Sequence, residues 1–514
     1  MEQQTIFDML YPKLKIDKPI RLIELFAGYG SQALALKYLG VNFEHWKICE
    51  WAVKSIQAYK DLHFTDDDVE LNPNRTKEDM IEFLYQKGIS ADYNKPMTKD
   101  QIKRLSEEQL KTIIKNIAIT HNLVNIQQVK GKDLEIKDTN LFTYLLTYSF
   151  PCQDLSLAGK KQGMTDTSTR SGLLWEVERI LTELDEKPQV LLMENVPQVH
   201  NQENMQDFFK WQNRLEELGY KNYWQDLIAT DYGIPQIRNR TFMVSILGDY
   251  NYAFPKPTPL KLKLKDMLED NAGEKYFLSE KCIKTMLKHD VDYQPSGLAP
   301  TLTTELSHHT GKNLTPKVIR EIYNAELEKY YLSNKMIDYI TSADDKYIVN
   351  ENKLVINRDI ACSKTTREGN TRADSSDYIC KELPENTNLK QFKMVTGGGN
   401  TPIIPIKNKT NKGYLEAEVG DGIDISSRME HHRGTVQKGK AQTLTTMGGE
   451  NNGVIANDLR IRKLTPKECF RLMGVKDKDY ERIAKNQSDS SLYHLAGDSI
   501  VVNVLMAIFN ELLQ

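Results

Sequence analysis

The first half of the chain alternates short apolar runs with polar and amphipathic stretches. The apolar runs have the length of buried strands, and the segment that follows the first of them, 32–39, has helical spacing. This alternation predicts an open α/β sheet. Strands are predicted at 21–26, 43–49, 144–150, 189–193 and 241–247, with a looser one at 125–129, and further helices at about 169–184 and 500–513.

The alternation is interrupted twice. Between 63 and 125 the chain is polar and charged, which predicts a helical insertion with a solvated face, and we assign it no chemistry. From about Pro255 the alternation fades, and a final apolar stretch follows Ser488. We therefore expect a first domain over 1–254, a second domain over 255–487, and a return of 488–514 to the first domain.

Composition excludes several classes of protein. The 514 residues carry a net charge of −3, so contact with nucleic acid would depend on local basic patches. The six cysteines include no C-x-x-C pair, which argues against a zinc site and a disulfide framework and favours a reducing compartment. The segment 1–18 lacks the apolar core of a signal peptide, and no apolar run reaches about 18 residues. We expect a cytoplasmic protein with no membrane span and no metal.

A glycine turn follows the first predicted strand. This turn, at 27–31, contains Gly28 and Gly30 and leads into a helix. Because glycine lets a ligand approach the backbone closely, the segment predicts a site for a nucleotide-like cofactor, while the missing third glycine disfavours a dinucleotide. The second strand ends at Glu50 and Trp51, which can accept hydrogen bonds from a ribose and cover an adenine ring. A surface acid and a core tryptophan are the structural alternatives.

A cysteine follows one of the apolar runs. Cys152 comes after Pro151, directly behind the strand predicted at 144–150, and active sites of open α/β sheets lie at the carboxyl ends of their strands. A thiol at this place can be a nucleophile or a small buried apolar group. The next stretch, 157–171, is rich in Gly, Lys, Ser and Thr, which indicates a flexible loop.

Other polar groups also stand near predicted strand ends. Asp133 follows the loose strand and can accept a hydrogen bond from an adenine amino group. Glu194 directly follows an apolar strand, where desolvation would raise its pKa and suit it to act as an acid near neutral pH; a helix N-cap is the alternative. Arg238 and Arg240 stand two apart on an extended segment, so they point the same way and offer two guanidinium groups to one ligand.

Taken together, these segments resemble the motifs of the cytosine-C5 DNA methyltransferases of bacterial restriction–modification systems, in the family's order, over 20–247 and 460–514. Two positions depart from the family pattern: Ser31 stands where glycine is common, and Asp498 stands where asparagine is usual. The matching segments are Phe26-Ala27-Gly28-Tyr29-Gly30, Pro151-Cys152-Gln153, Glu194-Asn195-Val196, Gln236-x-Arg238-x-Arg240, the stretch from Arg462 to Gly474, and Gly497-Asp498-Ser499-Ile500-Val501-Val502-Asn503-Val504.

The resemblance implies a DNA (cytosine-5-)-methyltransferase, with a Rossmann-like S-adenosylmethionine-dependent methyltransferase domain and a second, smaller target-recognition domain. It implies that the Cys152 thiolate adds to carbon 6 of a cytosine flipped out of the duplex, which makes carbon 5 nucleophilic. Glu194 would donate a proton to N3. Arg238 and Arg240 would stabilise charge on the O2 side, with Arg240 the closer match to the family's base-contacting arginine.

The implied cofactor is S-adenosyl-L-methionine and the implied partner is duplex DNA. We expect a monomer, and a cognate restriction endonuclease acting on the same site is a candidate partner. The residues expected to bind the cofactor are Phe26, Gly28, Gly30, Glu50, Trp51, Asp133, Pro151, Asp498, Ser499 and Ile500, and those expected to contact DNA are Gln153, Ser156, Gln236 and Arg433.

Short segments recur within the expected recognition domain. The segments 275–279 and 299–304 return as 329–333 and 441–446, which we interpret as a partly duplicated recognition module. Paired histidines accompany the second repeat, and we interpret them as loop contacts because no third metal ligand recurs. Basic residues cluster at 428–440 and 460–471 and predict a local DNA-binding surface; they are Arg428, Arg433, Lys438, Lys440, Arg460, Arg462, Lys463, Lys467 and Arg471.

Two alternatives remain at this point. A tRNA cytosine-C5 methyltransferase shares the catalytic core, but the long segment between Leu247 and Arg460 suits a reader of duplex DNA. A catalytically inactive DNA-binding regulator on the same fold is the second alternative, and it is disfavoured because all the chemical residues are present.

Overall fold

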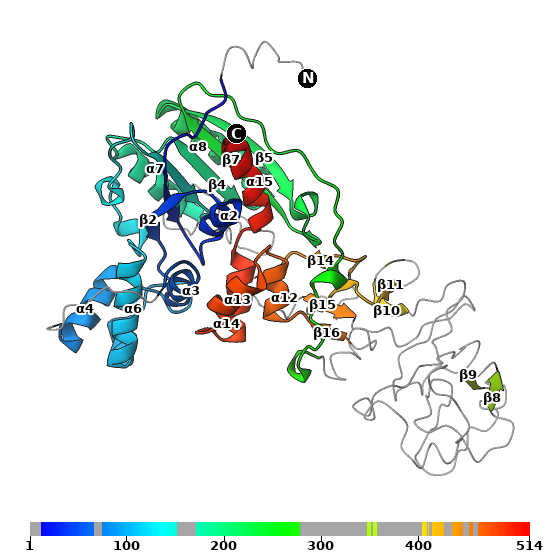
Figure 1. The fold of residues 1–514 in the computed structure, drawn as a ribbon. Helices are drawn as coiled ribbons and strands as arrows, with labels where there is room; N and C mark the ends of the chain where they lie inside the picture. Colours follow the sequence, from blue (N-terminus) through cyan, green and yellow to red (C-terminus); the bar gives the residue numbers. More distant parts are fainter. Residues whose placement is uncertain are drawn as a thin grey trace. The chain divides into compact units, whose positions relative to one another are not determined.

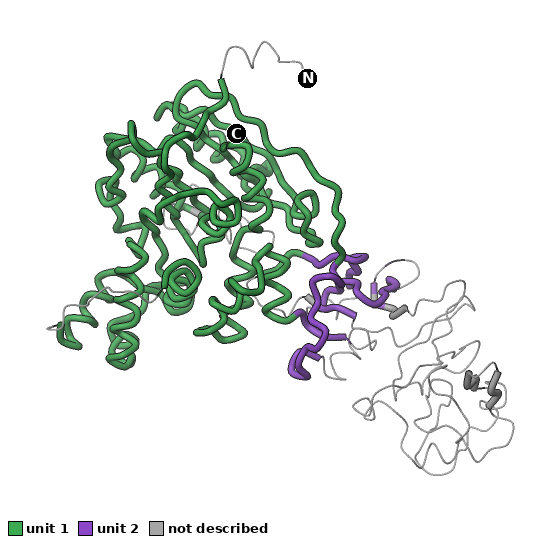
Figure 2. The backbone as a smooth tube through the Cα atoms, viewed as in Figure 1, with its two compact units in different colours: residues 1–263, 443–449, 465–514 green, residues 264–442, 450–464 purple. Residues whose placement is uncertain are grey.

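The structure is a computed structural model, and the residues that it describes divide into two compact units (Figure 2). Unit 1 comprises 1–263, 443–449 and 465–514, and unit 2 comprises 264–442 and 450–464. The described residues are 12–65, 75–151, 171–277, 347–350, 353–356, 403–408, 410, 414–425, 434–445, 452–455 and 461–513.

Unit 1 is built on a six-stranded sheet (Figure 1). Its strands are β1 (Ile20–Leu25), β2 (Phe43–Cys49), β3 (Thr143–Tyr148), β4 (Val190–Asn195), β5 (Tyr220–Ile228) and β7 (Asn239–Leu247), in the order β2-β1-β3-β4-β7-β5. The first four of them are parallel, and β7 is antiparallel to both β4 and β5. The sequence predicted every one of these strands except β5, and the mixed α/β fold is confirmed.

The strand order determines where a ligand can bind. In the sheet, β2 lies on one side of β1, and β3 and β4 lie on the other, so the direction in which the chain adds strands reverses at β1. Open α/β sheets bind ligands outside the carboxyl ends of the strands at such a reversal. The carboxyl ends of β1 to β4 therefore form one edge, which we call the ligand edge, and the glycine turn, Glu50, Pro151 and Glu194 all lie at or just beyond these strand ends.

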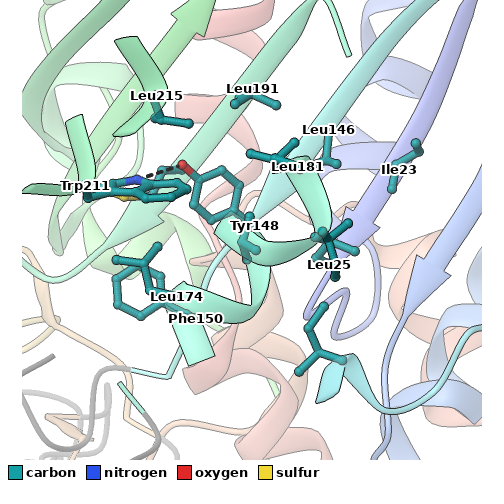
Figure 3. Packing of buried hydrophobic residues seen from close by; sticks show 14 of the residues in the cluster. Ile23, Leu25, Leu146, Tyr148, Phe150, Leu174, Leu181, Leu191, Trp211 and Leu215 are labelled. Atoms are coloured by element: carbon teal, nitrogen blue, oxygen red, sulfur yellow. Dashed lines mark hydrogen bonds between the residues drawn. The ribbon is translucent and has the colours of Figure 1, made fainter. Parts of the chain in front are cut away.

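Helices cover both faces of the sheet (Figure 1). On one face α2 (Ser31–Leu39) lies beside α15 (Val502–Leu513), and α7 (Leu174–Thr182) and α8 (Met205–Glu217) cover the other. Figure 3 shows the second layer, where the Trp211 indole of α8 donates a hydrogen bond of 3.1 Å to the Tyr148 hydroxyl of β3. Both side chains are almost fully buried, so the apolar surface around them contributes strongly to the stability of the unit.

One carboxyl group lies inside the other layer. Glu24 of β1 is fully buried and accepts hydrogen bonds from the Tyr59 hydroxyl and from the Ala33 amide at the start of α2. Burial raises the pKa of Glu24 to about 7, against the opposing effect of these two hydrogen bonds. The folded protein therefore keeps this proton at pH values where the unfolded chain, with a glutamate pKa of about 4.3, has released it.

Replacing Glu24 by glutamine is expected to remove a pH dependence of stability. Between about pH 4.3 and 7 the folded state binds more protons at this group, so the wild-type free energy of unfolding falls as the pH rises through that window. At pH 8 the Glu24→Gln variant should be more stable than the wild type by on the order of 2 kcal/mol, with little difference near pH 5. Thermal unfolding at both pH values measures this, and parallel profiles would contradict it.

Between β2 and β3 the chain forms a helical insertion. Its helices are α4 (Lys77–Lys87), α5 (Lys99–Lys103) and α6 (Glu107–Ile119), and each begins with a Ser or Thr capping box. They enclose an apolar cluster of their own. The insertion joins the end of β2 through two bridges, between Ile48 and Asn122 and between Ala52 and Ser90. It is thereby attached at the ligand edge.

The strand predicted at 125–129 is wrong. The structure has a short 3-10 helix, η1 (Ile126–Gln128), at this place. Val124 has a φ of 71°, which ends the extended backbone, and the Asn125 side chain then accepts the Gln127 amide hydrogen to cap η1. A β-branched residue at positive φ is rare, so the local sequence gives no warning of it.

The last part of unit 1 comes from the end of the sequence. It contains α12 (Pro466–Arg471), α13 (Asp477–Ala484), α14 (Asp489–Asp498) and α15. We expected the second domain to extend over 255–487, whereas α12 and α13 pack within unit 1: the Tyr38 hydroxyl of α2 donates to Asp479 at 2.7 Å. Local pattern could not reveal a contact over this separation.

The segment 489–513 is long and apolar enough to cross a membrane, whereas the sequence was expected to contain no such segment. Within the structure, 67 % of its most apolar 18-residue stretch is buried, and the helix is interrupted between α14 and α15. Its apolar residues therefore pack in the core of unit 1, which accounts for their hydropathy without a membrane.

The described part of unit 2 is all β apart from short 3-10 turns. β12 (Gly422–Asp424), β13 (Val436–Gln437), β15 (Asn452–Ile455) and β16 (Ile461–Lys463) form an antiparallel sheet in the order β13-β12-β15-β16. Two hairpins accompany it, β8 (Tyr347–Asn350) with β9 (Lys353–Ile356), and β10 (Ile403–Lys407) with β11 (Tyr414–Glu418). Most of the repeated segments, including all paired histidines, lie outside the described residues.

Candidate active site

The glycine turn after β1 leaves space at the ligand edge. Gly28 and Gly30 have φ values of 56° and 83°, which favour glycine. A Cβ atom added to Gly30 would collide with Tyr59 and His63, so the turn packs tightly on that side. A Cβ added to Gly28 would meet nothing within 4 Å. The turn therefore faces open space at Gly28, as a backbone that receives a ligand must.

Glu50 lies directly beside this space. Its carboxylate accepts the Gly28 amide hydrogen at 2.9 Å and the Ala52 amide hydrogen at 2.7 Å. The Asn122 amide group holds the Glu50 backbone, accepting its N–H at 3.0 Å and donating to its carbonyl at 2.8 Å. Burial raises the pKa of Glu50 to about 7, with a smaller contribution from the charge of Asp498 and against the opposing effect of the two backbone hydrogen bonds. A fixed carboxyl group beside an open glycine turn fits the hydroxyl groups of a nucleoside.

The other residues expected at the adenine differ in their surroundings. Trp51 is partly buried and packs against the apolar cluster of the insertion. Phe26 is also partly buried and has a φ of 59° at the start of the turn. Asp133 caps the short 3-10 helix η2 (Gly131–Leu134), where its carboxylate accepts the Lys130 amide hydrogen at 2.9 Å. No hydrogen bond within the described residues joins Asp133 to Glu50 or Trp51.

A sharp turn between α14 and α15 faces the glycine turn. The Arg238 guanidinium donates to the carbonyls of Gly497 at 2.9 Å and Ser499 at 2.7 Å, on either side of Asp498. The Ile500 amide donates to the Ser31 hydroxyl at 3.4 Å, which links this turn to the start of α2. The turn that carries three of the expected cofactor residues is therefore fixed at both ends.

The paired roles predicted for Arg238 and Arg240 are not what the structure shows. Arg238 is only 4 % exposed, and besides the two carbonyls above it donates to the Leu444 carbonyl at 2.9 Å. Its guanidinium is occupied by the protein itself. Gln236 is fully buried as well, and its side chain donates to the Leu472 carbonyl at 2.8 Å. Both residues hold the C-terminal segment on the sheet.

Arg240 and Glu194 form an ion pair at the ligand edge. The Arg240 Nε atom lies 3.1 Å from a carboxylate oxygen of Glu194, and both side chains are largely buried. Burial raises the pKa of Glu194; Arg240 and Arg238 oppose this, and Asp498 adds to it. The net direction is upward, as an acid working near neutral pH requires.

The ends of β3 and β4 are joined by one hydrogen bond. The two strands are parallel neighbours, and the Asn195 side chain donates to the Phe150 carbonyl at 3.0 Å. Pro151 follows at once and is partly exposed. Cys152, Gln153, Ser156 and Arg433 lie outside the described residues. The residues just before Cys152, Phe150 and Pro151, nevertheless lie next to the end of β4, which carries Glu194.

The insertion reaches the C-terminal helices through one aromatic contact. The Tyr93 ring, on the loop after α4, lies 3.7 Å from the His494 ring of α14, measured between centroids. His494 Nε2 is 3.8 Å from an Asp498 carboxylate oxygen. Glu50 and Asp498 both raise the pKa of Tyr93, although burial is the largest cause. Tyr93, His494 and Asp498 are thus close to the Glu50 site.

Ion pairs neutralise three cations of the basic surface predicted at 428–440 and 460–471, among the residues that the structure describes. Lys438 pairs with Asp421 and Glu418 in unit 2. In unit 1, Lys467 pairs with Asp477 and Glu481, and Arg471 also pairs with Asp477. The pairing acids lie just outside the two basic segments, at 418–421 and 477–481, so a count of the cations alone overstated the positive charge.

Several residues of the site were not predicted. Asn195 positions the end of β3, and Asn122 positions Glu50. Ser31 holds the turn between α14 and α15. Asn195 belongs to the motif around Glu194, which was the available signal. Asn122 acts on a residue far away in the sequence and had none. Tyr93 lies in the helical insertion, in which we expected no chemistry.

Comparison with known proteins identifies the family. The family described as "C-5 cytosine-specific DNA methylase" matches residues 102–514. The chain is 36 % identical over 270 residues to "Orphan methyltransferase M.SssI" of Spiroplasma monobiae, covering 51 % of this chain and 68 % of that protein. It is 36 % identical over 262 residues to "Type II methyltransferase M2.ScrFI" of Lactococcus lactis subsp. cremoris, covering 50 % and 70 %.

A third relative covers more of the chain. "Type II methyltransferase M.BanI" of Aneurinibacillus aneurinilyticus is 26 % identical over 433 residues, covering 78 % of this chain and 88 % of that protein. The resemblance stated from the motifs is thereby confirmed, and methyltransferases of this family use S-adenosylmethionine. The chain belongs to the C-5 cytosine-specific DNA methylases and is a DNA (cytosine-5-)-methyltransferase.

Proposed function

We propose that the enzyme methylates carbon 5 of a cytosine flipped out of duplex DNA, within a specific sequence, through a covalent adduct with Cys152. The observation that carries this proposal is the hydrogen bond from the Asn195 side chain to the Phe150 carbonyl. It holds the backbone that leads to Cys152 beside the end of β4, which carries Glu194. A nucleophile and a proton donor from adjacent strand ends can act on the same pyrimidine ring.

Each group would have a separate task. The Cys152 thiolate adds to carbon 6, and Glu194 protonates N3, so that electron density moves to carbon 5. Arg240 stabilises charge on the base and holds Glu194 in place. S-adenosylmethionine supplies the electrophilic methyl group. After transfer, loss of the carbon 5 proton and departure of the Cys152 sulfur release the methylated base.

The cofactor would occupy the space between the glycine turn and the turn at Asp498. Glu50, fixed by Gly28 and Asn122, would accept hydrogen bonds from the ribose hydroxyls. Phe26, Trp51 and Pro151 would cover the adenine. Asp133 remains a proposed adenine contact with no described link to these residues.

We further propose that the segment 255–487 contains the target-recognition domain. The enzyme would act as a cytoplasmic monomer and as the modification enzyme of a restriction–modification system, whose endonuclease cuts the same unmodified sequence. Bisulfite sequencing of DNA from cells that express the protein would identify that sequence. The tRNA alternative is not favoured, because the matching family is one of DNA methylases.

Trapping with a fluorinated base tests the covalent route. Duplex DNA with 5-fluorocytosine at the target should remain bonded to the wild-type enzyme, because fluorine at carbon 5 cannot leave as a proton. The Cys152→Ser variant should form no adduct and should lose at least about 10³-fold of its methylation rate. Cys49 and Cys469 serve as matched controls, since both are buried and burial raises the pKa of their thiols.

Mass spectrometry of a protease digest would locate the bonded cysteine. A wild-type enzyme that methylates ordinary DNA but leaves no adduct on the fluorinated duplex would rule out the covalent route. Methyl transfer from labelled cofactor to total tRNA, with none to duplex DNA, would instead overturn the choice of substrate.

A further inference from the structure

Asp498 presents a carboxylate at the ligand edge that the chemistry above does not use. Its side chain is 63 % exposed, although Gly497 and Ser499 on either side are buried. The hydrogen bonds from Arg238 to the carbonyls of Gly497 and Ser499 fix the backbone around it. The carboxylate is therefore held in place by its backbone while its oxygens remain accessible.

This charge acts on both halves of the site. Asp498 contributes to the raised pKa of Glu50, the proposed ribose acceptor, and to that of Glu194, the proposed proton donor, with burial the larger cause in each case. The hydrogen bond from the Ile500 amide to the Ser31 hydroxyl, at the start of α2, brings the turn that carries Asp498 next to the glycine turn. The carboxylate therefore lies beside the proposed cofactor space.

Contact with solvent favours the ionised form of this carboxylate. Desolvation raises the pKa of Asp498 overall, and the charges of His494, Arg238 and Arg240 oppose that rise. The side chain is nevertheless 63 % exposed, so water can solvate its charge. The ionised carboxylate would add a negative charge beside the proposed cofactor space.

Methyl transfer changes the charge of the cofactor. S-adenosylmethionine carries a positive sulfonium, and S-adenosylhomocysteine, the product, carries a neutral thioether; the amino and carboxylate groups are the same in both. On the basis of the proposed function, we propose that Asp498 distinguishes the charged cofactor from its neutral product. It would favour binding of the methyl donor and release of the spent product.

The comparison of Asp498→Asn with wild type tests this inference by direct binding. Asparagine has nearly the same shape and removes only the charge. Calorimetric titration should show about a fivefold loss of affinity for S-adenosylmethionine and less than about a twofold change for S-adenosylhomocysteine, as expected for one charge pair at a partly exposed site. Sinefungin, which has a positively charged amine in place of the sulfonium, should follow the methyl donor.

A control variant separates this effect from a general change in charge. Asp489→Asn removes an acid from the other end of α14 and should leave all three affinities unchanged. Equal losses for the three ligands in Asp498→Asn, or none, would overturn the inference, because the carboxylate would then not act on the sulfonium. Failure of the wild type to bind S-adenosylmethionine at all would instead contradict the proposed function.

Discussion

Replacement of Glu194 by glutamine is expected to lower kcat by about 10²- to 10³-fold with little loss of stability. Glu194 is 8 % exposed and ends β4 beside Arg240, and burial keeps its pKa raised. Glutamine has the same size and can still accept a hydrogen bond from Arg240, so packing should survive. It cannot transfer a proton to N3, so the barrier to attack by Cys152 should rise.

The pH profile distinguishes this role from a structural one. A proton donor acts only below its own pKa, so the wild-type kcat should fall as the pH rises through the raised pKa of Glu194, and the variant should lack that decline. Single-turnover rates between about pH 6 and 9 would measure the decline in the wild type and its absence in the variant, because catalytic glutamates have pKa values raised to about 6–7. Glu194→Gln with wild-type rates would exclude Glu194 as the acid.

Replacement of Arg238 by leucine is expected to lower the free energy of unfolding by about 3 kcal/mol or more, because three buried carbonyl oxygens lose a charged donor. Cofactor affinity should fall in parallel, since the turn at Asp498 would lose its anchor. Urea denaturation and cofactor titration measure the two effects.

Arg240→Leu is the matched control, two residues further along the chain. Arg240 pairs with Glu194 and is bonded to one main-chain carbonyl, that of Asn239. We therefore expect a smaller loss of stability, about 1 kcal/mol, together with a larger loss of kcat. If the two variants had equal stabilities and equal rates, the separate roles of these arginines would be wrong.

The strands and the central residues of the site could be predicted because their signals are local. An apolar run followed by a polar residue indicates both the strand and its end, and this located β1 to β4 with Glu50 and Glu194. The direction of the Arg238 side chain could not be predicted. Residues i and i+2 share a face only within a regular strand, and Arg238 lies between β6 (Gln236–Ile237) and β7.

The remaining errors concern groups outside the segments on which each prediction rested. The acids that pair with Lys438 and Arg471 lie just beyond the basic segments, and the helices that return to unit 1 are brought to it only by the fold. Tyr93 illustrates the same limit, because its partner His494 lies about 400 residues further along the chain. Composition indicates which groups exist, and the tertiary structure determines which of them are already paired.

The late position of α12 to α15 affects how the protein is made. β7 ends at Leu247 and α12 begins at Pro466, so the ribosome completes the sheet long before it synthesises the helices that cover α2 and accept the hydrogen bonds of Arg238. Until then, an apolar surface of the nascent chain has no cover and is open to aggregation or to chaperones. Enzymatic competence would therefore arise only after α15 has been synthesised, and chains that terminate before it would be inactive.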